Sequence, residues 1–85
     1  MDLSDWRSRI DALDRQVVDL LNERMRCALE IGQIKRVGGQ PIRVPAREKA
    51  LLEGLKEYNE GPMSAEAIDD IFNRVMAEAR SLEAE

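Results

Sequence analysis

A helical seam runs without interruption through the first 34 residues of this 85-residue chain. Its positions alternate three and four residues apart, the spacing of a helix that buries one face in a bundle or coiled coil. The seam consists of Leu3, Trp6, Ile10, Leu13, Val17, Leu20, Arg24, Cys27, Ile31 and Ile34. Asp2 or Ser4 can cap its start, and Gly38-Gly39 ends it. The pattern predicts one long helix over residues 3–37.

Two shorter helices are expected after the first. Pro45 suits a first helical turn, which predicts a helix over residues 45–58. Residues 59–62 form a break, and Ser64 is expected to cap a third helix over residues 64–83. The expected apolar positions are Val44, Leu51, Leu52, Leu55 and Tyr58, then Ile68, Ile71, Phe72, Val75, Met76, Ala79 and Leu82. Strand patterns are lacking, so we predict an all-α fold that forms one domain over residues 1–85.

The first helix is longer than a compact chain of this size. A helix of 34 residues extends roughly 50 Å at about 1.5 Å per residue. A compact 85-residue chain has a diameter of about 30 Å. Two short helices cannot cover such a seam, so we predict an intertwined homodimer whose long helices are antiparallel or steeply crossed. The alternative is a monomer whose first helix breaks near Gly32, but the seam continues to Ile34.

Composition narrows the classes of function. The chain carries a net charge of −4, which argues against nucleic acid or an anionic membrane as the main partner. No apolar run approaches the roughly 20 residues of a membrane span, and no signal peptide precedes the first helix, so we expect a cytoplasmic protein. Histidine is lacking, which excludes a histidine-based site. The single Cys27 fits a reducing compartment and, on the seam, is expected in the core.

Each predicted helix carries one ionisable residue where an apolar residue is expected: Arg24, Glu48 and Glu83. Burying an unpaired charge is costly, so these groups either pair with one another or line a cavity for a polar ligand. Taken singly, each has another explanation. Arg24 could extend its head to solvent, Glu48 suits the positive end of its helix dipole, and Glu83 lies near a terminus where helices fray.

Lys35 favours the cavity over these alternatives. It lies eleven residues after Arg24 on nearly the same helix face, about 16 Å along the axis. Gly32 lies between them and presents no side chain to obstruct a ligand. Arginine and lysine bind carboxylates, and neither a nucleophile with a partnered base nor a metal-ligand set is visible. Arg7 is about 25 Å from Arg24 in the same helix, so it could reach such a site only in the partner of an antiparallel dimer.

The chain resembles the all-α, AroQ-class chorismate mutases over nearly its whole length. The resemblance runs through Trp6-Arg7, Ile10–Asp14 (IDALD), Leu20–Arg24 (LLNER), Ile31–Lys35 (IGQIK), Gly39–Ile42 (GQPI) and Arg47-Glu48. It implies an intertwined homodimer with shared sites that converts chorismate to prephenate, within one molecule and without a cofactor. It assigns the two substrate carboxylates to Arg24 and to Arg7 of the partner subunit. Lys35 would donate to the ether oxygen, Glu48 would bind the ring hydroxyl, and Arg47 would lie at the pocket edge.

Three residues depart from the pattern that this resemblance implies. Val44 stands where the family often has Asp, and Ala79 where it often has a small polar residue. Glu83 stands where Gln often supplies a second donor to the ether oxygen. A carboxylate cannot donate a hydrogen bond, so Glu83 would act there only as a carboxylic acid, although nearby Lys35 favours its ionised form. We therefore expect activity to fall as pH rises through the titration of Glu83.

Two other functions remain open at this level. An isochorismate–pyruvate lyase shares this fold and much of the site, and Val44 in place of an acidic residue is compatible with it. A helical dimerisation or regulatory module without catalysis is the second, but it would not require Arg24, Lys35, Glu48 and Glu83 in phase. Domains of the family also occur fused to, or bound by, other enzymes of aromatic biosynthesis.

Overall fold

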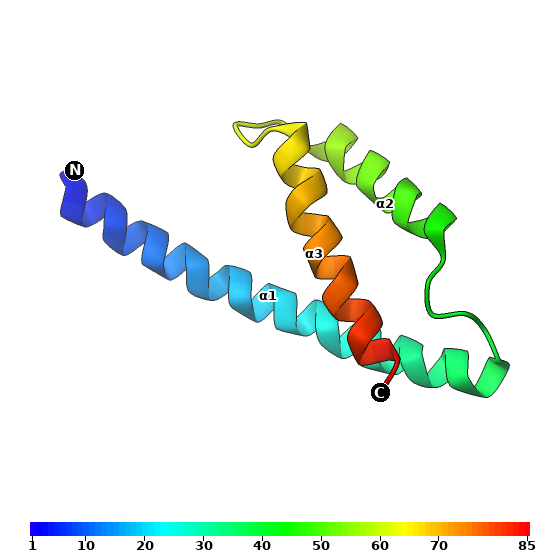
Figure 1. Ribbon diagram of the computed structural model, residues 1–85. Coiled ribbons are helices and arrows are strands. Elements are labelled where there is room, and N and C mark those ends of the chain that lie inside the picture. The colour runs from blue at the N-terminus through cyan, green and yellow to red at the C-terminus, as the bar shows by residue number, and fades with distance from the viewer.

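The computed structural model describes all 85 residues as three α-helices joined by two short connections, without any strand. Helix α1 spans Leu3–Gly38, α2 spans Pro45–Tyr58 and α3 spans Ala65–Glu83 (Figure 1). The all-α prediction is therefore confirmed. The expected bounds differ from the observed ones by one residue at the end of α1 and by one at the start of α3. None of the three helices combines the length and apolarity that a bilayer span requires.

Local side-chain chemistry sets the helix ends. At the start of α1 the side chain of Asp2 accepts the backbone N–H of Asp5 at 3.0 Å, and Asp5 accepts that of Asp2 at 3.1 Å. This reciprocal capping box selects Asp2 over Ser4 as the cap. Gly39 ends α1 with φ at 66°, a left-handed conformation that glycine adopts without strain. The predicted cap of α3 is confirmed, since the Ser64 hydroxyl accepts the backbone N–H of Ala67 at 3.1 Å.

Helix α3 packs against both other helices, and these two packings hold the chain together (Figure 1). It crosses the C-terminal half of α1, while α2 lies along its other side. The N-terminal half of α1 projects beyond this assembly, so the chain measures 54 Å along its longest axis. Its radius of gyration of 15.9 Å exceeds the roughly 12 Å of a compact chain of this length. A single chain is thus extended rather than compact.

The buried core is small and lies where α3 meets its neighbours. Its apolar members are Ala28, Ile68, Val75, Met76 and Ala79. The predicted apolar stripes are only partly buried: Ile71 is 48% exposed and Tyr58, at the end of α2, is 84% exposed. Burial of Tyr58 and Ile71 within the chain is thus a wrong expectation. Each stripe is wider than the area that the other helices of the same chain cover.

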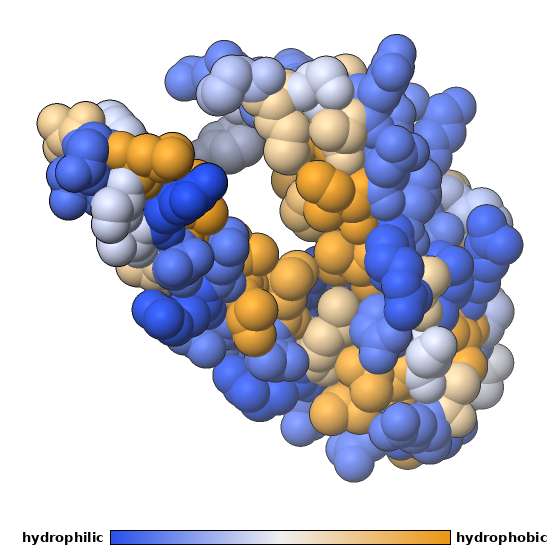
Figure 2. Space-filling model, turned by 60° about the vertical axis from the view of Figure 1, so that its left-hand side comes forward, coloured by the Kyte–Doolittle hydropathy of each residue, from blue (hydrophilic) through white to orange (hydrophobic).

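The seam of α1 stays uncovered by its own chain. From Leu3 to Leu20 its apolar members are half to two-thirds exposed: Leu3, Trp6, Ile10, Leu13, Val17 and Leu20. Figure 2 shows apolar side chains gathered on the side of the projecting helix that faces α2 and α3 across an open space. Helix α1 is continuous through Gly32, so the alternative of a break there is wrong. An exposed apolar face of this extent is typical of a protein interface.

Candidate functional site

A pocket of about 500 Å³ lies where the C-terminal half of α1, the start of α2 and the end of α3 meet. This volume is within the usual range for small-molecule sites. Its charged lining residues are Arg24, Lys35, Arg47, Glu48, Arg80 and Glu83, and its other lining residues are Cys27, Ala28, Ile31, Ile42, Val44, Leu51, Met76 and Ala79. All three helices therefore contribute to a partly apolar cavity with a charged lining.

Seven of the eight residues singled out from the sequence line this pocket: Arg24, Lys35, Val44, Arg47, Glu48, Ala79 and Glu83. Arg7 does not. It borders a shallow depression beside Asp2 and Asp11 at the N-terminal end of α1. Since α1 is continuous, Arg7 is about 25 Å along the helix axis from Arg24. One chain thus supplies most of the expected site but leaves Arg7 outside it.

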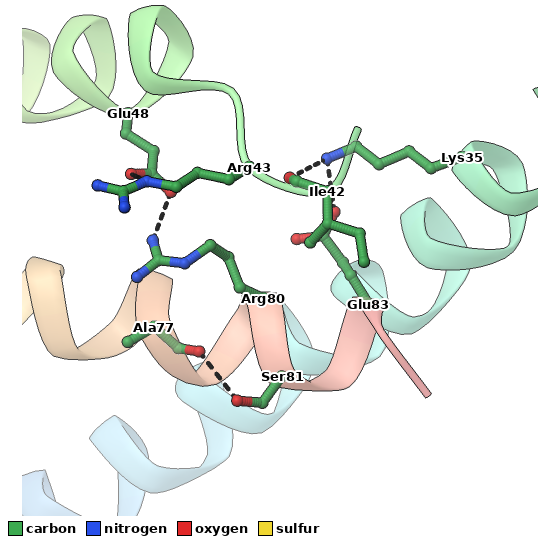
Figure 3. Close-up of polar contacts among 8 residues, drawn as sticks. All are labelled: Lys35, Ile42, Arg43, Glu48, Ala77, Arg80, Ser81 and Glu83. Carbon is green, nitrogen blue, oxygen red and sulfur yellow. Dashed lines mark hydrogen bonds and ion pairs between the residues drawn. The ribbon is translucent and has the colours of Figure 1, made fainter. Parts of the chain in front are cut away.

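Lys35 and Glu83 form an ion pair at one end of the pocket (Figure 3). Lys35 Nζ is 2.7 Å from Glu83 Oε1 and donates a hydrogen bond of 2.8 Å to the backbone carbonyl of Ile42. Glu83 Oε1 is buried and accepts no hydrogen bond, so the charge of the nearby Lys35 ammonium group is its sole compensation for leaving water. Of the three N–H donors of the Lys35 ammonium group, the Ile42 carbonyl takes one, so the group retains donor capacity for a ligand.

The last turn of α3 is held against α1 at Gly32, and this contact places Glu83. A Cβ atom at position 32 would lie 2.6 Å from the backbone oxygen of Glu83 and 2.8 Å from its Cα atom. The lack of a side chain at Gly32 therefore allows α1 and α3 to approach closely, in addition to leaving space for a ligand. Arg36 donates to the backbone carbonyl of Glu83 at 3.0 Å and also to that of Glu85. The alternative explanation, that Glu83 frays into water at the end of its helix, is wrong, because Glu83 is only 8% exposed.

Glu48 is held by arginines at the other end of the pocket (Figure 3). Arg80 NH1 donates to Glu48 Oε2, and Arg43 Nε lies 3.6 Å from Glu48 Oε1. The sequence reasoning missed Arg80. The available signal was its position next to Ala79 and three residues before Glu83, which puts it on an adjoining part of the same helix face. Cys27, expected in the core, is exposed in the chain and lines the pocket.

The pocket has an excess of positive charge. Four cationic side chains and two carboxylates line it, which leaves an excess of two positive charges. Lys35 and Arg80 are paired with the two carboxylates, whereas Arg24 and Arg47 form no ion pair within the chain. Half-buried Arg24 in particular is a guanidinium with no anion beside it. Such a set suits a small molecule with two carboxylates, which guanidinium groups bind through paired hydrogen bonds.

Comparison with known protein families supports the resemblance seen in the sequence. The family described as chorismate mutase type II matches residues 6–84. The T-protein of Haemophilus influenzae is 37% identical over 78 residues, an alignment that covers 91% of this chain and 21% of that protein. The bifunctional chorismate mutase/prephenate dehydratase of Aquifex aeolicus is 36% identical over 86 residues, covering 96% of this chain and 24% of that protein. The chain thus spans under a quarter of the length of these relatives.

Solved structures share the fold as well. The form II chorismate mutase of Thermus thermophilus superposes with a TM-score of 0.93 at 32% identity, covering 95% of this chain and 92% of that one. The chorismate mutase of Helicobacter pylori, solved in complex with prephenate, superposes with a TM-score of 0.88 at 32% identity, covering 95% and 88%.

Proposed function

We propose that this chain, which belongs to the chorismate mutase type II family, catalyses the rearrangement of chorismate to prephenate. One observation carries the proposal. The pocket gathers Arg24, Lys35 and Glu48 from two different helices in a cavity with excess positive charge. Chorismate is a dicarboxylate, so its charge complements that excess. The reaction breaks a C–O bond and forms a C–C bond within one molecule, and the proposal therefore needs no nucleophile, metal or cofactor.

The proposed mechanism relies on holding the substrate and matching its changing charge. Arg24, which has no anion beside it, would bind one carboxylate. The free donor of Lys35 would bond to the ether oxygen, where negative charge grows as the C–O bond breaks. Glu48 would accept the hydrogen bond of the ring hydroxyl. Preorganised donors and a fixed reactive conformation are each sufficient for large rate enhancements in such reactions.

Glu83 adds a condition to this mechanism. Its carboxylate pairs with Lys35 when no ligand is bound. To donate a hydrogen bond to the ether oxygen it must take up a proton, and a protonated Glu83 would also release Lys35 from the ion pair. We propose that the most active form of the enzyme carries this proton. The wall residues Val44 and Ala79 offer no side-chain hydrogen bond, so the substrate contacts there are limited to the backbone and to apolar packing.

A homodimer completes the proposed site. The exposed seam of α1 requires a partner surface of similar length, and a second antiparallel copy of the same helix provides one. The second carboxylate of the substrate would then be bound by Arg7 of the partner subunit. The relative from Aquifex aeolicus is named a bifunctional chorismate mutase/prephenate dehydratase, so fusion to, or a complex with, another enzyme of aromatic biosynthesis is compatible with the mutase activity that we propose for this chain.

The decisive experiment follows chorismate loss by the purified protein and identifies the product. Prephenate formation supports the proposal. Isochorismate is supplied in a parallel reaction, and pyruvate release from it would identify a lyase instead. Failure to convert either substrate, together with no binding of a bicyclic dicarboxylate that mimics the transition state, would favour a non-catalytic helical module.

Shared sites are tested by mixing two inactive variants. Arg7→Ala and Arg24→Ala should each abolish activity as homodimers. In a heterodimer one site carries both changes and the other carries neither, so random reassortment should restore about a quarter of wild-type activity. Mixing Arg24→Ala with Lys35→Ala is the matched control. Both changes lie in the same-chain part of the pocket, so every mixed site stays defective and no activity should return.

A further inference from the structure

We propose that Arg80 is a positioning residue that fixes the carboxylate of Glu48 in the pocket and keeps it from pairing with Arg24 or Arg47. This inference rests on the proposed function, because its effect is measured as the binding and turnover of a substrate whose ring hydroxyl Glu48 would bind. Arg80 is not among the residues to which the family resemblance assigns a role. The tertiary structure places it in the lining of the pocket.

The geometry of the pair is specific. Arg80 on α3 extends across to Glu48 in the first turn of α2, and its NH1 donates to Oε2 (Figure 3). The two side chains are only 29% and 18% exposed, so water screens the pair weakly. The second cation near Glu48 is a poorer partner. Arg43 Nε is 3.6 Å from Oε1 and its side chain is 67% exposed, a combination that contributes little in water.

Apart from the exposed Arg43, no other group fixes the orientation of Glu48. Helix α2 begins without a side-chain cap, and α3 is the only helix that packs against it. A glutamate side chain has three rotatable bonds, so an unpaired carboxylate would sample several directions. Arg80 binds one oxygen from inside the pocket and leaves Oε1, which only the distant Arg43 approaches, as the acceptor for a substrate hydroxyl. The pair therefore directs one acceptor towards the ligand.

Arg80 also preserves the charge that the substrate needs. Without it, Glu48 would be the one pocket carboxylate lacking a close cation, and Arg24 and Arg47 line the same cavity. A carboxylate that turned to either guanidinium would compete with the substrate for it. Arg80 thus stabilises Glu48 in a way that leaves the two remaining cations available. Loss of Arg80 should weaken substrate binding even though Arg80 itself need not touch the substrate.

The test compares Arg80→Met with Arg74→Met, a change of the same type on the same helix. Arg74 pairs only with Glu78 on the exposed face of α3, at 3.3 Å. A hydrogen bond to a charged group is worth about 1.5–3 kcal/mol, or roughly 10- to 150-fold. We expect Arg80→Met to lower kcat/KM by about 10-fold or more, mainly through a higher KM. Arg80→Lys should recover part of this loss, and Arg74→Met should stay within about two-fold of wild type.

The remaining variants separate positioning from other roles. If Arg80 acts through Glu48, the double variant Glu48→Gln/Arg80→Met should lose no more activity than Glu48→Gln alone. If the loss of activity in the double variant equalled the product of the losses in the two single variants, the inference would be overturned, because Arg80 would then contact the substrate directly. A lower kcat with unchanged KM would also overturn it, since a partly unfolded protein gives that result.

Failure of the proposed function would be recognised separately. If the wild-type protein converts no chorismate, the mutase proposal fails while the pair can still be examined. In a crystal structure of Arg80→Met, the Glu48 carboxylate should have left its position, either towards solvent or towards Arg24 or Arg47. A Glu48 side chain that keeps its position without Arg80 would overturn the inference regardless of any activity.

Discussion

Replacing Gly32 by alanine tests how the close contact between α1 and α3 builds the site. The added Cβ would lie 2.6 Å from the backbone oxygen of Glu83 and 3.1 Å from its carbonyl carbon. Ordinary van der Waals contacts of a Cβ atom begin near 3.4 Å, so the last turn of α3 must retreat by about 0.8 Å. The obstructing atoms are backbone, and no side-chain rotation can relieve the contact. Glu83, and with it the ion pair to Lys35, would have to move.

Two opposing effects, helix propensity and overpacking, determine the expected stability of Gly32→Ala. Alanine in place of glycine within a helix stabilises by about 1 kcal/mol, and overpacking costs about 1–3 kcal/mol. Gly32→Ala should therefore change the free energy of unfolding by between zero and a loss of about 2 kcal/mol. Gly54→Ala is the matched control, because a Cβ there meets nothing within 4 Å. It should gain up to about 1 kcal/mol, so the two variants should differ by about 1–3 kcal/mol.

Activity should respond more strongly than stability. A displacement of about 1 Å at reacting groups can cost roughly 100-fold in rate. Urea unfolding of both variants at one protein concentration, combined with kcat and KM for chorismate, provides the measurement. Gly54→Ala should keep wild-type kinetics. If Gly32→Ala were stabilised as much as Gly54→Ala and retained full activity, the argument that this contact positions Glu83 would be refuted.

Three further predictions concern the charged pocket and the exposed seam. Arg24→Leu should remain folded and dimeric, with a stability equal to or above that of the wild type because an unpaired half-buried charge is lost. Its kcat/KM should fall by at least about 100-fold, and substantial turnover would contradict the role of Arg24. The pH–rate profile of Glu83→Gln should be flatter than that of the wild type, since the amide donates a hydrogen bond at every pH and a carboxylate does not; superimposable pH–rate profiles would disprove this. Leu13→Asp, far from the pocket within its own chain, should yield single subunits in sedimentation and abolish activity; an active monomer would exclude the shared site.

The sequence was sufficient to predict the helices and most of the charged positions of the site. Periodicity and capping residues act locally, so the extent of each helix could be read from neighbouring residues. Arg24 and Lys35 belong to one helix, whose rigid geometry places both on nearly the same face whatever packs against it. The excess length of α1 was likewise evident, because helix rise and domain size are both known quantities.

Contacts between helices could not be predicted in the same way. The pairing of Arg80 with Glu48 joins residues 32 positions apart, and it depends on the angle and register at which α3 meets α2. Those quantities are set by side-chain packing along the whole contact rather than by any local pattern. The same reason explains why Tyr58 and Cys27, which have the right spacing for burial, are exposed in the single chain.

Local sequence thus determined where the chain is helical, which faces are apolar and which charges interrupt them. Only the tertiary structure decided which of those charges neutralise one another and which stay free. In the tertiary structure Glu83 packs against Gly32 and Glu48 pairs with Arg80, whereas Arg24 has no anion beside it. The physical reason is range: helix formation is governed by contacts within about four residues, whereas the charge balance of a pocket depends on distances between separate helices.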